Sequence, residues 1–186
     1  MDAAATQALK TFFTSPRFAV AGASSDPTKF GHKIFAWYLT HSLPVTPLNP
    51  RAASITAGAN NTPHATLPSP SALPAPADTA LSVVTPPRAT LALLREAKEV
   101  GVRAVWLQPG TFDAEVEAFV LGESKAEEGK GNGGEGGEGD KDQGKPPFEA
   151  ALFGSRWGRG GEGWCVLVDG EEGLRVAGRE WRRARI

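Results

Sequence analysis

The chain has 186 residues, of which 40% are hydrophobic and 22% are charged, and its formal net charge is −1. These values predict one globular domain and exclude an intrinsically disordered chain. The 20 basic and 21 acidic residues lack the basic excess that is typical of nucleic-acid-binding proteins. The one cysteine, Cys165, excludes an internal disulfide and a cysteine-based metal cluster. No apolar run approaches the roughly 18 residues of a membrane span, and the N-terminal segment does not resemble a signal peptide, so we expect a cytoplasmic protein without membrane contacts.

Short apolar runs that end in turn-forming residues alternate with amphipathic segments along the chain. Four such runs cover residues 17–21, 45–48, 80–84 and 102–107, and a fifth, WCVLV, covers residues 164–168. Helical spacing of apolar residues follows the first, third and fourth runs, and a polar helix is expected to run from the fifth to about Trp181. This alternation predicts an α/β fold, a Rossmann-like doubly wound sheet of five parallel strands with helices on both faces.

Two segments interrupt the alternation. Residues 51–80 are rich in Ala, Pro, Ser and Thr, which favours an extended connection with little regular helix. Residues 122–147 contain 9 Gly, 7 acidic residues and 4 Lys, so this low-complexity insert has almost no side chain to bury and is expected to be disordered. The whole chain, residues 1–186, is expected to form a single domain that carries this insert.

The residues that follow the first strand suit a phosphate-binding loop. Gly22 permits a tight turn, and the small residues Ala23 and Ser24 let backbone amides approach a phosphate at the start of the next helix. Lys29 adds a positive charge. A tight turn without a ligand explains the same loop, so both interpretations stay open at this point.

The loop differs from two well-known nucleotide-binding motifs. The pattern GxGxxG would need glycines at positions 22, 24 and 27, where this chain has Gly, Ser and Pro. The second strand ends at Asn49 and Pro50 and lacks the acidic residue that binds the ribose of NAD. No GKS or GKT follows, which excludes a Walker A loop. Ordinary NAD binding and P-loop NTP hydrolysis are therefore disfavoured.

Four motifs, AVAGASSDPTKFGHKIFAWYL, PVTPLNP, VVTPP and GVRAVWLQPG, occur in this order within residues 12–121. In these motifs the chain resembles the CoA-binding domain family, in particular its stand-alone Rossmann-like members, and is similar to the N-terminal domain of the succinyl-CoA synthetase alpha subunit; residues 163–186 match loosely. The resemblance implies that CoA or an acyl-CoA binds across the strand ends. Carried over by motif, the implied CoA contacts are Gly22, Ala23, Ser24, Lys29, Asn49, Pro50, Arg51, Thr85, Pro86, Pro87, Gln108 and Gly110. Arg51 and Arg88 are suited to pair with the phosphates of the ligand, but solvated arginines on the surface explain these positions equally well.

No catalytic constellation is visible in the sequence. His32 suits general acid–base chemistry but also a surface or capping role, and Cys165 lies in an apolar run where an inert buried thiol is expected. Asp169 is expected to cap the helix after the fifth run. We therefore expect a binding protein for a small nucleotide ligand that performs no reaction of its own, and no thioester-forming reaction. The alternatives are an NAD(P)-type oxidoreductase with an atypical Gly22 loop, or a non-enzymatic regulatory or scaffold protein whose insert binds a partner.

Overall fold

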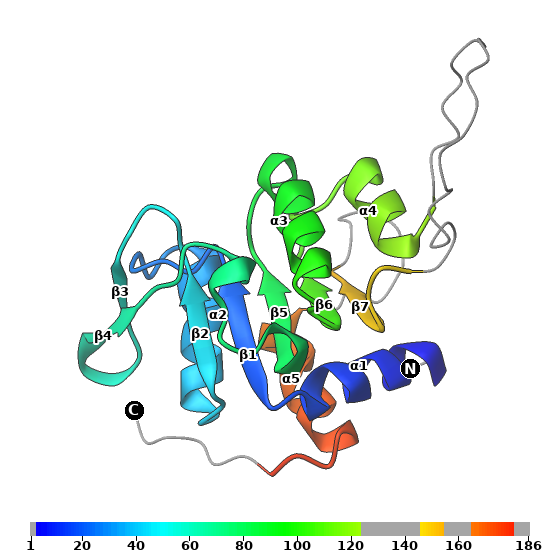
Figure 1. The fold of residues 1–186 in the computed structure, drawn as a ribbon. Coiled ribbons are helices and arrows are strands. Elements are labelled where there is room, and N and C mark those ends of the chain that lie inside the picture. The colour runs from blue at the N-terminus through cyan, green and yellow to red at the C-terminus, as the bar shows by residue number, and fades with distance from the viewer. Residues whose placement is uncertain (1–2, 124–145, 155–164, 181–186) are drawn as a thin grey trace, which may run out of the picture.

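The computed structural model describes residues 3–123, 146–154 and 165–180 of the chain. In the described residues, five parallel strands form one sheet in the order β2-β1-β5-β6-β7 (Figure 1). This confirms the Rossmann-like α/β fold and the first four predicted strands. The strands are β1 (Arg17–Ala21), β2 (Val45–Leu48), β5 (Thr79–Val83), β6 (Ala104–Leu107) and β7 (Ala150–Phe153).

Helices cover both faces of this sheet. Alternate residues of a strand point to opposite faces, so Phe18 and Val20 of β1 enter one hydrophobic cluster, and Ala19 and Ala21 enter the other. The first cluster includes residues of α1 (Ala3–Thr14), α2 (Phe30–Thr40) and α5 (Val166–Val176), and the second includes residues of α3 (Pro87–Glu99) and α4 (Ala114–Leu121). The sheet is therefore doubly wound.

The prediction of a strand at residues 164–168 is wrong. Trp164 lies outside the described residues, and Val166 begins α5, where Asp169 accepts a hydrogen bond from the Cys165 N–H at 2.7 Å. Asp169 therefore caps the start of this helix, as expected, although from within its first turn. The fifth strand is instead β7, whose residues Ala150–Phe153 pair with Ala104–Leu107 of β6.

Two glycines explain how the apolar run Val166–Val168 becomes part of a packed helix. A Cβ atom at Gly170 would lie 2.4 Å from the Trp37 ring, and one at Gly173 would lie 2.3 Å from the Phe13 ring. Only glycine at these positions lets α5 approach α1 and α2 this closely. The predicted insert at 122–147 falls for the most part on residues 124–145, which lie outside the described part of the chain.

Residues 51–80 contain little regular helix, as predicted, but also an antiparallel hairpin that was not predicted. The hairpin consists of β3 (Ser54–Ala57) and β4 (Thr62–Ala65), and three 3-10 turns occupy Ala59–Asn61, Pro70–Ala72 and Pro76–Asp78. After the hairpin the chain runs along the outer edge of β2. There Leu67 donates its N–H to the carbonyl of Pro47 at 3.0 Å and accepts the N–H of Asn49 at 2.9 Å.

A buried polar pair joins α2 to the middle of the sheet. The Tyr38 hydroxyl lies 2.8 Å from the Ser82 hydroxyl, and both residues are fully buried. Burial raises the pKa of Tyr38 well above its ordinary value, so the phenol is protonated at neutral pH.

Tyr38→Phe is expected to lower the free energy of unfolding by about 1–3 kcal/mol, because it leaves the Ser82 hydroxyl buried without this partner. Urea denaturation measures the change. Ser82→Ala in the Tyr38→Phe background should recover part of the loss, and strictly additive losses in the double variant would contradict a direct interaction.

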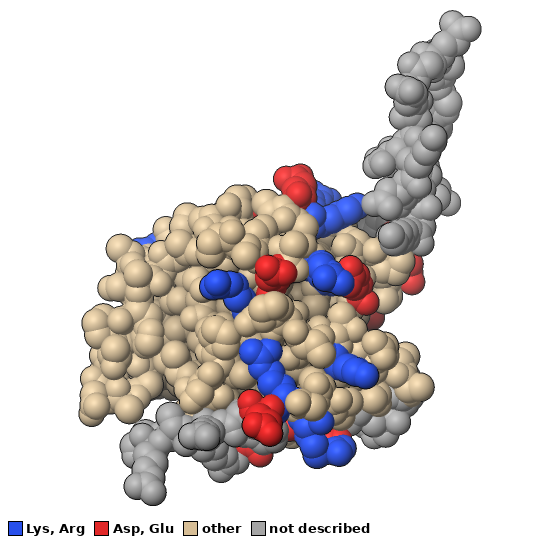
Figure 2. Space-filling view, turned by 60° about the horizontal axis from the view of Figure 1, so that its bottom comes forward, with Lys and Arg blue, Asp and Glu red and all other residues tan. Residues whose placement is uncertain are grey.

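Basic and acidic side chains are interspersed on the surface that Figure 2 displays, and no large area of a single sign is visible there. This agrees with the near-neutral composition. No described helix combines the length and apolarity that crossing a membrane would require.

Candidate functional site

The residues that the sequence singled out follow four neighbouring strands. In the spatial order of the sheet, they are residues 49–51 after β2, 22–24 after β1, 85–87 after β5 and 108–110 after β6. The chain leaves β1 toward α2 on one face and leaves β5 toward α3 on the other. The carboxyl ends of β1 and β5 therefore form a topological switch point, the place where open α/β sheets bind ligands.

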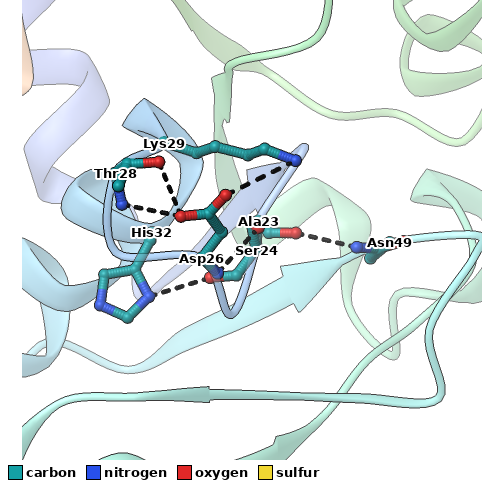
Figure 3. A network of polar contacts seen from close by, with 7 residues as sticks. All are labelled: Ala23, Ser24, Asp26, Thr28, Lys29, His32 and Asn49. Atoms are coloured by element: carbon teal, nitrogen blue, oxygen red, sulfur yellow. Dashed lines mark hydrogen bonds and ion pairs between the residues drawn. The ribbon is translucent and has the colours of Figure 1, made fainter.

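The carbonyl groups of the loop after β1 are held by two side chains from different elements. The Asn49 Nδ2 group donates to the Ala23 carbonyl at 2.9 Å, and the His32 Nδ1 atom lies 3.0 Å from the Ser24 carbonyl (Figure 3). Because a carbonyl only accepts, His32 Nδ1 carries the proton. The amides of Ala23, Ser24 and Ser25 donate no hydrogen bond to any described residue. Consecutive free amides of this kind are suited to an anion.

Two glycines set the shape of this loop. Gly22 has φ +90°, a left-handed conformation that L side chains rarely adopt, so the predicted need for glycine at this turn is confirmed. A Cβ atom at Gly31 would lie 2.0 Å from the Gly22 carbonyl oxygen. The first turn of α2 thus packs directly on the loop, a contact that sequence reasoning missed.

A local turn orders the segment between the loop and α2. The Asp26 carboxylate accepts hydrogen bonds from the Thr28 hydroxyl at 2.7 Å and the Thr28 N–H at 2.9 Å. These hydrogen bonds hold the pKa of Asp26 below its ordinary value, so the carboxylate is charged at neutral pH. Lys29 Nζ lies 4.0 Å from Asp26 and extends across the loop in Figure 3. Its positive charge offsets the acidic group beside the free amides.

The other two neighbouring loops approach the first from either side. Thr85 follows β5, and its backbone N would lie 3.3 Å from a Cβ atom placed on Gly22, so the two loops are close together. The Thr85 hydroxyl lies 2.8 Å from the Thr90 hydroxyl. Pro86 and Pro87 then start α3. On the other side Asn49 accepts the N–H of Arg51 at 2.8 Å, which fixes the exposed Pro50–Arg51 turn beside Ala23. Residues 22–24, 49–51 and 85–87 are thus brought together.

Gln108 is placed differently from the rest. Its side chain is 1% exposed, and its Oε1 accepts the Val166 N–H at 3.2 Å, so it holds the start of α5. Its Nε2 is buried, without a hydrogen-bond partner in the described part of the chain. Within this loop Gly110 is the exposed residue, with φ +83°. Gln108 therefore faces the interior, whereas Gly110 lies on the surface.

The structure places the two candidates for catalysis, His32 and Cys165, in different environments. The His32 ring holds the Ser24 carbonyl, which is a structural contact. Burial raises the pKa of the Cys165 thiol, so it stays protonated at neutral pH. Among the described residues, no group of three or more His, Cys, Asp and Glu side chains could hold a metal ion.

Comparisons with known proteins give the family and the fold to which the chain is similar. The chain matches the family described as CoA binding domain over residues 16–125. A conserved hypothetical protein from Pyrococcus furiosus is 31% identical, with a TM-score of 0.49 over 55% of this chain and 83% of that chain. The structure of cell-free ID.343 from Thermus thermophilus is 28% identical, with a TM-score of 0.50 over 63% and 82% of the two chains. A hypothetical protein from Pyrococcus horikoshii has the same fold at 21% identity, with a TM-score of 0.52 over 60% and 75%. No curated protein matches the chain.

Proposed function

Because this chain belongs to the CoA-binding domain family, we propose that it binds CoA or an acyl-CoA across the carboxyl ends of β2, β1 and β5. The observation that carries this proposal is the loop of residues 22–25. Asn49 and His32 hold two of its carbonyls, and three consecutive amides remain available to an anionic group. The diphosphate of CoA is such a group, and the start of α2 adds the favourable end of a helix dipole.

The remaining residues of the site have roles consistent with this ligand. Lys29 supplies positive charge above the loop, and the exposed turn at Pro50–Arg51 provides a second basic side chain beside it. Thr85, Pro86 and Pro87 form the β5 side of the site, and Gly110 lies on the surface at its far end. The Gln108 side chain is not assigned a contact with the ligand, because it holds the start of α5 in place.

We propose further that the protein binds its ligand without catalysing a reaction. The support comes from the two side chains that the sequence offered as candidates for catalysis. His32 donates its Nδ1 proton to a backbone carbonyl of the loop, and the Cys165 thiol has a raised pKa.

CoA is expected to bind the purified chain with a measurable heat, and NAD at the same concentration is expected neither to bind nor to compete. The physical reason is the end of β2, where Asn49 replaces the acidic residue that binds the ribose of NAD. Isothermal titration with CoA, acetyl-CoA and NAD tests this. Tight binding of NAD with no heat from CoA would favour the oxidoreductase alternative instead.

A further inference from the structure

Phe30, the first residue of α2, has an unusual environment for an aromatic side chain. It is 60% exposed, whereas every other phenylalanine in the described residues is buried or half-buried. A single exposed apolar residue needs no special explanation. Here, however, Phe30 immediately precedes Gly31, whose Cβ position would lie 2.0 Å from the Gly22 carbonyl oxygen, so the residue starts the helix that packs on the loop assigned to the CoA phosphates.

Two cations accompany this ring. The Lys33 Nζ group lies 5.5 Å from the centre of the Phe30 ring, a cation–π arrangement between residues one helical turn apart. Lys29 immediately precedes Phe30, and its side chain is 66% exposed. An accessible aromatic face with adjacent positive charges is suited to a ligand that combines a flat heteroaromatic base with a nearby anion.

CoA carries this combination in its nucleotide half, where the adenine base is attached to a ribose with a 3′-phosphate. We propose that Phe30 stacks on the adenine of CoA and that Lys33 pairs with the 3′-phosphate. Phe30 and Lys33 thereby form a specificity-determining corner that distinguishes CoA from ligands without the 3′-phosphoadenosine. This inference rests on the proposed function and extends it to a part of the ligand that the loop after β1 does not recognise.

Three probes separate the parts of the ligand: CoA, dephospho-CoA without the 3′-phosphate, and 4′-phosphopantetheine without the whole nucleotide. Phe30→Ala is expected to weaken the binding of CoA and dephospho-CoA by at least about fivefold, which corresponds to the lower end of the free energy of stacking a base on an aromatic ring. The variant should bind 4′-phosphopantetheine with the affinity of the parent. Phe30→Trp should retain CoA affinity, since it keeps an aromatic face. Lys33→Gln should reduce the preference for CoA over dephospho-CoA, and this reduction should diminish at high salt.

Leu121→Ala is the matched control, because Leu121 is also an exposed apolar side chain, at 44%, but it ends α4 on the other face of the sheet. It should bind all three probes like the parent, and circular dichroism should show that every variant is folded. Unchanged CoA affinity in Phe30→Ala, or equal losses for all three probes, would overturn the adenine assignment while leaving CoA binding intact. Failure of the parent chain to bind CoA would overturn the proposed function and this inference together.

Discussion

Gly31→Ala is expected to abolish measurable CoA binding and to lower the free energy of unfolding by about 1–3 kcal/mol, as overpacking commonly does. In an ordinary helix, alanine in place of glycine would stabilise by about 1 kcal/mol. Here the added methyl group would lie 2.0 Å from the Gly22 carbonyl oxygen, so α2 and the loop must separate. That separation displaces the free amides from the start of the helix. Calorimetric titration and thermal unfolding measure the two effects.

Gly170→Ala provides the matched control for this substitution. It also adds a methyl group to a crowded helical glycine, where the Cβ atom would lie 2.4 Å from the Trp37 ring. The contact joins α5 to α2 away from the loop, so stability should fall but CoA affinity should not. If Gly31→Ala bound CoA as tightly as Gly170→Ala does, the loop after β1 would not be the phosphate site.

Asn49→Asp is expected to weaken CoA binding by at least about tenfold, the equivalent of about 1.4 kcal/mol. The substitution replaces the Nδ2 donor that holds the Ala23 carbonyl by an oxygen, which cannot donate, and it places a negative charge beside the phosphate site. Part of the loss should be recovered at high salt, because ionic screening weakens the repulsion between the carboxylate and the ligand. Titrations at two ionic strengths measure both components.

Asn49→Ala separates the lost hydrogen bond from the added charge. This variant also releases the Ala23 carbonyl but adds no charge, so its affinity should fall less and should recover less at high salt. Equal binding by the parent and Asn49→Asp would show that the hydrogen bond between β2 and the loop is not needed for CoA recognition.

The sequence predicted those parts of the fold that depend on burial and turns. Four strands were found because each is a short apolar run that is followed within two residues by glycine, proline or asparagine. β7 was missed because Ala150–Phe153 is only four residues long and two of them are alanines, so its apolar pattern is weak even though Gly154 follows it. α5 was misread because Val166–Val168 favours a strand locally, and its helical state depends on contacts of Gly170 and Gly173 with distant aromatic rings.

In the candidate site, too, the local sequence motifs predicted some residues correctly, whereas contacts between distant elements were not predicted. Gly22, Ala23 and Asn49 were identified from the motifs around them, and the structure places them in contact. Gln108 belonged to the same set, but its side chain turns inward to α5, which the sequence had placed as a strand. The roles of His32 and Gly31 depend on how closely α2 packs on the loop. Such a distance cannot be deduced from one sequence, although the nine-residue spacing between Gly22 and Gly31 is a signal for it.

The return of the chain along β2 has a consequence for behaviour in solution. An edge strand with free backbone groups is a template on which another chain can add a strand, which leads to aggregation. On the outer side of β2, Leu67 already uses the carbonyl of Pro47 and the N–H of Asn49, and Pro47 itself has no N–H to offer. The carboxyl end of this edge is therefore closed to an incoming strand. The same segment that anchors Asn49 beside the binding loop protects this part of β2 against edge-to-edge association between molecules.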